Sequence, residues 1–247
     1  MRKQYKQLKW TCLFIFCMVL PSLCNADVVS REFVVLLHGL ARSKSTMAKL
    51  GRSLSESGYG VLNLGYPSRV LTIEEISERY VPKAIKICRQ NNAKKIHFVT
   101  HSMGGIIVRY YLKHHYMPEL GRVVMLSPPN KGSEVVDKLK NNFLFKWLNG
   151  PAGQQLGTNS NSLPRQIGNV NFYLGVIIGD RSINFLLSII IPGPDDGKVS
   201  IESAKIEGMK DFIIIHSSHP FIMKNKNAIL QTIAFIKNGK FIRKSNN

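Results

Sequence analysis

The order of apolar segments along the chain restricts its fold more than any other feature. Short runs rich in Val and Ile alternate with longer segments of helical periodicity. Strands are predicted over residues 33–37, 59–64, 95–100, 122–126, 172–178 and 212–215, and helices over 46–57, 73–91, 103–115, 134–148 and 227–237. Alternation of this kind indicates an α/β fold in which helices cover both faces of a mostly parallel sheet.

A single domain over residues 27–247 accommodates all of these elements. They follow one another without an internal repeat or a linker, and a chain of 247 residues can bury a sizeable core. Thr72 and Glu75 have the spacing of a capping box, which predicts that a helix begins just after Thr72. Residues 149–170 lose periodicity and are rich in Gly, Asn, Gln and Ser. Such a long irregular segment is typical of a functional or mobile loop.

The first 26 residues have the pattern of a cleaved signal peptide. An apolar run over residues 10–20 follows a basic start and is too short to span a bilayer as a helix. Small residues then precede a cleavage site after Ala26. We therefore expect export, to the periplasm or out of the cell. An uncleaved anchor and lipidation of Cys24 are the alternatives.

The chain is strongly basic, with a net charge of +19, and loss of the four lysines and arginines of the signal peptide leaves 19 − 4 = +15. Such an excess suits nucleic acid or an anionic phospholipid surface. The basic residues are scattered, however, and accompany no nucleic-acid motif. We therefore expect no nucleic-acid partner, and peripheral contact with an anionic membrane is the interaction that the charge favours.

The stretch 96–107 carries the clearest chemical signal. An apolar strand leads into His101-Ser102-Met103-Gly104-Gly105, and a helix follows. A serine at the tip of such a sharp turn is exposed for nucleophilic attack, and the turn needs small neighbours because strand and helix approach closely. Gly104 meets that need, whereas Thr100 stands where the usual G-x-S-x-G pattern has glycine. The alternative is a strand–helix turn in which Ser102 only caps the helix.

At this point the chain resembles the α/β-hydrolase superfamily, and within it the compact bacterial lipases and the lipases related to GPI-inositol deacylases. His38-Gly39-Leu40 is similar to the His-Gly dipeptide of the oxyanion loop. Residues 127–133 (SPPNKGS) resemble the loop after the next strand in these lipases, and residues 196–200 with His219 resemble the loops of the acid and the base. The resemblance implies an α/β-hydrolase fold with a minimal sheet of about six strands.

The resemblance also implies a Ser-His-Asp mechanism. Ser102 would be the nucleophile, and the backbone N–H groups of Leu40 and Met103 would form the oxyanion hole. In the superfamily the acid follows the serine in the chain, and the histidine follows the acid.

The acid and the base each have competing candidates. Asp196 directly precedes a glycine, as the acid of the family does, but Asp195 and Asp180 also lie in loops. His219, just before a proline, stands where the family has its base, and His216 at the end of a strand is the alternative.

The expected reaction is hydrolysis of carboxylic esters through an acyl-enzyme, with lipid acyl esters as substrates. An acyltransferase would use the same residues, and a binding protein could keep the fold without chemistry. The apolar stretch 184–191 is either an acyl-binding wall or a buried strand or turn. The sequence contains no HExxH, CxxC or other metal motif, and no phosphate-binding glycine loop, so no metal or cofactor is expected.

Overall fold

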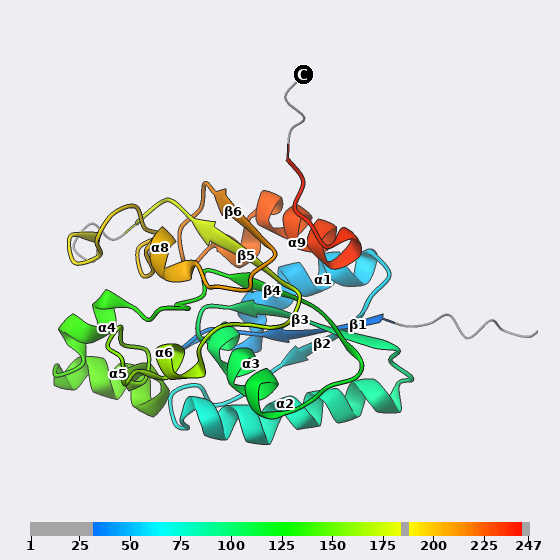
Figure 1. Cartoon of the computed structure of the whole chain (residues 1–247), viewed down its shortest axis with the longest axis horizontal. Helices are drawn as coiled ribbons and strands as arrows, with labels where there is room; N and C mark the ends of the chain where they lie inside the picture. Colours follow the sequence, from blue (N-terminus) through cyan, green and yellow to red (C-terminus); the bar gives the residue numbers. More distant parts are fainter. Residues whose placement is uncertain (1–31, 184–187, 244–247) are drawn as a thin grey trace, which may run out of the picture.

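The computed structural model describes residues 32–183 and 188–243, in which six strands form one parallel sheet (Figure 1). The predicted signal peptide, residues 1–26, lies outside the described residues. Within the sheet the order is β2-β1-β3-β4-β5-β6, and every neighbouring pair is parallel. The strands are β1 (Glu32–Leu37), β2 (Gly60–Leu64), β3 (Lys95–His101), β4 (Leu120–Leu126), β5 (Leu174–Gly179) and β6 (Asp211–Ile215).

Helices lie on both faces of this sheet, as the alternation of segments predicts. Helices α2 and α3 pack on one face, and α1 and α9 pack on the other (Figure 1). In the part of the chain that the structure describes, no helix has both the length and the apolar character needed to cross a membrane. The helices are α1 (Ala48–Glu56), α2 (Ile73–Gln90), α3 (Met103–His114), α4 (Glu134–Leu139), α5 (Phe143–Gln154), α6 (Leu163–Ile167), α8 (Ile201–Ala204) and α9 (Lys226–Asn238), with short 3₁₀ helices at Lys44–Met47 and Ile222–Lys224.

The central strands are buried on both faces, which explains their continuous apolar runs. Alternate residues of β1 point to opposite sides: Val34 and Leu36 join the core beneath α1 and α9, while Val35 and Leu37 join the core beneath α2 and α3. Burying each such side chain stabilises the fold by roughly 1.5–3 kcal/mol. The two cores hold the parallel strands in register, so the loops at their C-terminal ends meet along one edge.

The predicted start of α2 is confirmed. Thr72 is the N-cap, its hydroxyl accepts a hydrogen bond from the Glu75 N–H at 3.2 Å, and the Glu75 carboxylate accepts one from the Thr72 N–H at 2.9 Å. This reciprocal pair satisfies two amide donors that have no partner within the helix.

The predicted helix over 134–148 is instead two helices, α4 and α5. The chain leaves the first helix at Lys140, and Asn142 begins the second by accepting a hydrogen bond from the Phe145 N–H at 3.0 Å. The helical periodicity of the sequence continues through this break, so the pattern predicts a single helix. An Asn within such a pattern can nevertheless cap a new helix. The segment 149–170, expected to be irregular, contains the end of α5 and all of α6.

The capping box makes a measurable contribution to stability. We expect Thr72→Ala to lower the free energy of unfolding by about 1 kcal/mol, because the first turn of α2 loses its side-chain acceptor. Chemical denaturation followed by circular dichroism measures this. Ser55→Ala, an exposed substitution within α1, is the control and should leave stability unchanged or slightly raised. Equal stability of Thr72→Ala and wild type would contradict the assignment.

Candidate active site

Ser102 stands on a strained turn between β3 and α3. Its backbone has φ 54° and ψ −125°, and its N–H donates to the Leu126 carbonyl at 2.9 Å. A non-glycine residue adopts such a conformation only where the surroundings enforce it, and such residues cluster at functional sites. Gly104 is one cause, because a Cβ there would lie 2.8 Å from the Leu37 carbonyl oxygen. Helix α3 therefore packs directly against the end of β1, and the serine is held at the tip.

Thr100 occupies the position where the usual motif has glycine. Its side chain is fully buried, and a Cβ built at Gly105 would lie 3.3 Å from the Thr100 Oγ1. Gly105 thus leaves the space that the threonine side chain needs. The two glycines after the serine thus let the start of α3 pack closely on the neighbouring strand ends, although threonine stands before the turn.

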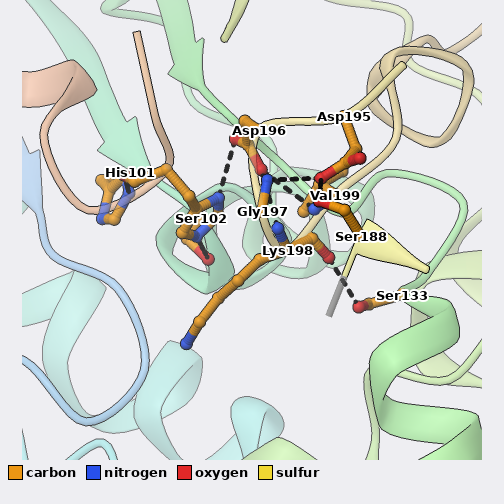
Figure 2. A network of polar contacts seen from close by, with 10 residues as sticks. His101, Ser102, Ser133, Ser188, Asp195, Asp196, Gly197, Lys198 and Val199 are labelled. Carbon is orange, nitrogen blue, oxygen red and sulfur yellow. Dashed lines mark hydrogen bonds and ion pairs between the residues drawn. The ribbon is translucent and has the colours of Figure 1, made fainter. Parts of the chain in front are cut away.

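Ser102, His219 and Asp196 form a hydrogen-bonded chain. Nε2 of His219 lies 3.1 Å from the Ser102 Oγ, and its Nδ1 lies 2.8 Å from an Asp196 oxygen. The imidazole and the carboxylate are both buried. The other Asp196 oxygen accepts hydrogen bonds from the N–H groups of Lys198 and Val199, at 3.1 and 3.0 Å (Figure 2). These main-chain donors fix the carboxylate, which in turn orients the imidazole.

The loops of His219 and Asp196 are also joined through the main chain. The His219 N–H donates to the Asp196 carbonyl at 2.8 Å. Gly179, at the end of β5, lies where both loops cross, because a Cβ there would lie 2.1 Å from the Ser217 carbonyl oxygen and 3.1 Å from the Asp196 Cβ. The side-chain pair therefore sits on a fixed backbone.

The competing candidates have other partners. Asp195 is buried, and its carboxylate accepts hydrogen bonds from the Gly197 N–H and the Ser188 hydroxyl (Figure 2). His216 and Asp180 bond to each other at 3.0 Å, but this pair is exposed. Among the described residues, neither His216 nor Asp180 bonds to Ser102.

His101, the residue before Ser102, contacts the loop of His219. Its ring is buried, its Nε2 lies 3.0 Å from the His219 carbonyl oxygen, and the two rings are 4.9 Å apart. Burial, and then the charge of His219, lower the pKa of His101 well below its usual value. A neutral His101 that donates from Nε2 therefore ties the base loop to the residue before the serine. Only the adjacency of His101 to Ser102 could have suggested this from sequence.

The predicted oxyanion donors both belong to segments next to Ser102. Met103 is the first residue of α3, where amide N–H groups have no acceptor within the helix. Leu40 follows His38-Gly39 at the end of β1 and lines the same pocket as Ser102. The His38 ring stacks on Tyr66 with centroids 4.0 Å apart, and the Tyr66 hydroxyl donates to the His38 carbonyl. This packing holds the loop that presents Leu40.

The pocket in front of Ser102 is mainly apolar, with two basic side chains, Arg42 and Lys198, among its walls. Its apolar walls come from the oxyanion loop, from α4 and α5, and from the segments around them: Leu40, Pro129, Val135, Val136, Phe145, Leu156 and Val199. Of the stretch 184–191, predicted as either an acyl-binding wall or a buried strand or turn, residues 184–187 lie outside the described residues. Ile189 is exposed and Ile191 is buried, and neither lines this pocket.

No group of three His, Cys, Asp or Glu side chains is placed to hold a metal ion within residues 32–183 and 188–243. The polar groups that are hydrogen-bonded in a chain at Ser102 are a hydroxyl, an imidazole and a carboxylate. That set suits attack by an activated serine.

Comparison with known proteins identifies the family of the chain. The family described as "Putative serine esterase (DUF676)" matches residues 30–161, more than half of the chain. That range contains Ser102 and the predicted oxyanion residues but neither Asp196 nor His219. No curated protein sequence matches the chain.

Solved structures of lipases and esterases share the fold. The mature lipase BlEst2 of Bacillus licheniformis superposes with a TM-score of 0.65 at 21% identity, over 87% of this chain and 94% of that one. A metagenomic carboxyl esterase, MGS0156, gives 0.61 at 17% identity over 85% and 76%. The phospholipase PlaB of Legionella pneumophila gives 0.60 at 19% identity, over 70% of this chain and 44% of that one. The chain therefore belongs to this serine esterase family, has the α/β-hydrolase fold, and is a carboxylic ester hydrolase.

Proposed function

We propose that the protein hydrolyses esters of apolar acyl chains through a triad of Ser102, His219 and Asp196. One observation carries this assignment: the His219 imidazole bridges the serine hydroxyl at 3.1 Å and the aspartate at 2.8 Å. The apolar walls beside Ser102 support an acyl chain as the group that is bound there.

The geometry supports a two-stage reaction. The Ser102 Oγ attacks the ester carbonyl as Nε2 of His219 takes its proton, while Asp196 holds the imidazole by its other nitrogen. The N–H groups of Leu40 and Met103 stabilise the oxyanion that forms. His219 then protonates the leaving alcohol, and an acyl-enzyme remains on Ser102. Water cleaves that ester in the second stage, with His219 again acting as base. An acyltransferase would use an alcohol in place of water at that stage. Measuring how the acyl group divides between free acid and new ester when an alcohol is added therefore separates the two activities.

Replacing the nucleophile tests the mechanism directly. We expect Ser102→Ala to lower kcat for p-nitrophenyl esters by roughly 10⁴-fold or more, because no other group supplies the covalent step. Wild-type protein should become labelled by a fluorophosphonate probe, and the variant should not. Circular dichroism of the variant controls for folding. Turnover by pure Ser102→Ala at the wild-type rate would exclude the proposal.

The two histidine–aspartate pairs give a matched comparison. His219→Ala and Asp196→Asn should each reduce kcat by roughly 10³-fold or more, because the base or its orienting carboxylate is lost. His216→Ala, Asp180→Asn and Asp195→Asn should retain most of the activity. Steady-state kinetics on one ester measures all five. A large loss in His216→Ala together with activity in His219→Ala would reverse the assignment.

We further propose that the exposed face of α5 contacts an anionic lipid surface. Phe143 is 81% exposed and Trp147 is 63% exposed, while Phe145 of the same helix lines the pocket. The segment 138–154 contains three lysines and no Asp or Glu. An apolar face flanked by basic residues suits a membrane interface, and here it adjoins the entrance to the site.

Vesicle co-sedimentation tests this contact apart from catalysis. We expect Phe143→Ser combined with Trp147→Ser to weaken binding to vesicles containing phosphatidylglycerol by about tenfold or more, because two large apolar side chains no longer enter the interface. Tyr116→Ser, at the far end of α3 and 92% exposed, is the control. Unchanged vesicle binding by the double variant would assign this face another role. So would self-association of the wild-type protein that the double variant abolishes.

A further inference from the structure

Two basic side chains enter the pocket beside Ser102 from opposite loops. Arg42 lies two residues after Leu40 of the oxyanion loop, and Lys198 lies two residues after Asp196 of the acid loop. Both line the pocket that contains Ser102 and His219. Each cation is therefore carried by a loop that also holds a group needed for the proposed reaction.

Lys198 is anchored at its backbone and free at its end. Its N–H donates to Asp196 at 3.1 Å, and its carbonyl accepts a hydrogen bond from the Ser133 hydroxyl at 2.9 Å. The side chain extends away from both contacts and past Ser102 (Figure 2). Among the described residues, neither Lys198 nor Arg42 forms an ion pair, and no Asp or Glu lines the pocket.

The two charges act on each other and on the site. Arg42 and Lys198 are both exposed. Desolvation among the pocket walls, and then the charge of Arg42, still lower the pKa of Lys198, against the nearby Asp196 carboxylate, which raises it. Both cations also contribute to the lowered pKa of the buried His101. Like charges held near each other are unfavourable, and an anion placed between them would relieve that repulsion.

We propose that Arg42 and Lys198 form a subsite for an anionic group, a carboxylate or a phosphate, carried by the ester substrate. This inference deepens the proposed function and rests on it, because it concerns the same pocket. The apolar wall takes the acyl chain, and the two cations take a negative charge attached near the scissile carbonyl. A guanidinium and an ammonium both form charge-assisted hydrogen bonds to such oxygen atoms.

Paired substrates test the subsite on both sides of the ester bond. For the alcohol side, monohexanoylglycerol is compared with its phosphate monoester. For the acyl side, p-nitrophenyl butyrate is compared with p-nitrophenyl hydrogen succinate. The readout is the ratio of kcat/KM for the anionic ester to kcat/KM for the neutral one, which cancels any general effect on the triad.

We expect the wild-type ratio to exceed one in at least one pair, and that pair identifies the side that carries the charge. Lys198→Gln and Arg42→Gln should each lower this ratio about tenfold, the effect of removing one attractive charge in a partly desolvated site. Lys198→Arg keeps the charge and should largely preserve the ratio. Lys86→Gln, exposed on α2, is the matched control and should not change it.

The outcomes separate the subsite from the reaction. A preference for the neutral ester in both pairs, or a ratio unaffected by Lys198→Gln and Arg42→Gln, would overturn the subsite while neutral esters are still turned over. Failure of the wild-type protein to react with a fluorophosphonate probe and with every ester would instead overturn the proposed function.

Discussion

The close approach of three backbone segments at Ser102 is the constraint on which the site depends. The end of β1, the strand β3 and the start of α3 meet so closely that a Cβ at Gly104 would contact the Leu37 carbonyl, and one at Gly39 would lie 2.9 Å from Nδ1 of His101. Main-chain packing of this kind leaves the serine with a positive φ and projects its side chain from the sheet edge. The same contact brings the Leu40 loop beside the start of α3. The positions of the proposed nucleophile and of both predicted oxyanion donors thus follow from one packing arrangement.

The second pair, His216 and Asp180, shows why burial matters as much as pairing. It has the same residue types and a similar distance, 3.0 Å, as the pair of His219 and Asp196. Water screens the exposed pair, so its mutual orientation contributes little. Around the buried pair, backbone N–H groups satisfy the remaining oxygen of Asp196, so the carboxylate is held in one position and can orient the imidazole.

The sequence predicted the layered α/β architecture well, because strands buried on both faces and amphipathic helices leave different periodicities. It predicted the cap at Thr72 because that signal is local. The break between α4 and α5 was missed, since both helices keep the same apolar spacing across Asn142. The ranking of Asp196 over Asp180, and of His219 over His216, came from a family resemblance. Periodicity alone could not decide it, because both acids follow β5 and both histidines follow β6. The pair at Ser102 is set by tertiary contacts, among them the close approach of the two loops at Gly179, and these leave no local pattern.

His101 illustrates a relation that no local pattern encodes. Its neighbour Ser102 is the proposed nucleophile, and its own Nε2 bonds the carbonyl of His219, the proposed base, which is 118 residues away in the chain. If this imidazole were protonated, its buried charge would lie beside the imidazolium that the proposed mechanism forms on His219. Burial and the nearby cations oppose that protonation, since all of them lower the pKa of His101. The residue can therefore hold the base loop in place at neutral pH without adding a positive charge where the reaction must create one.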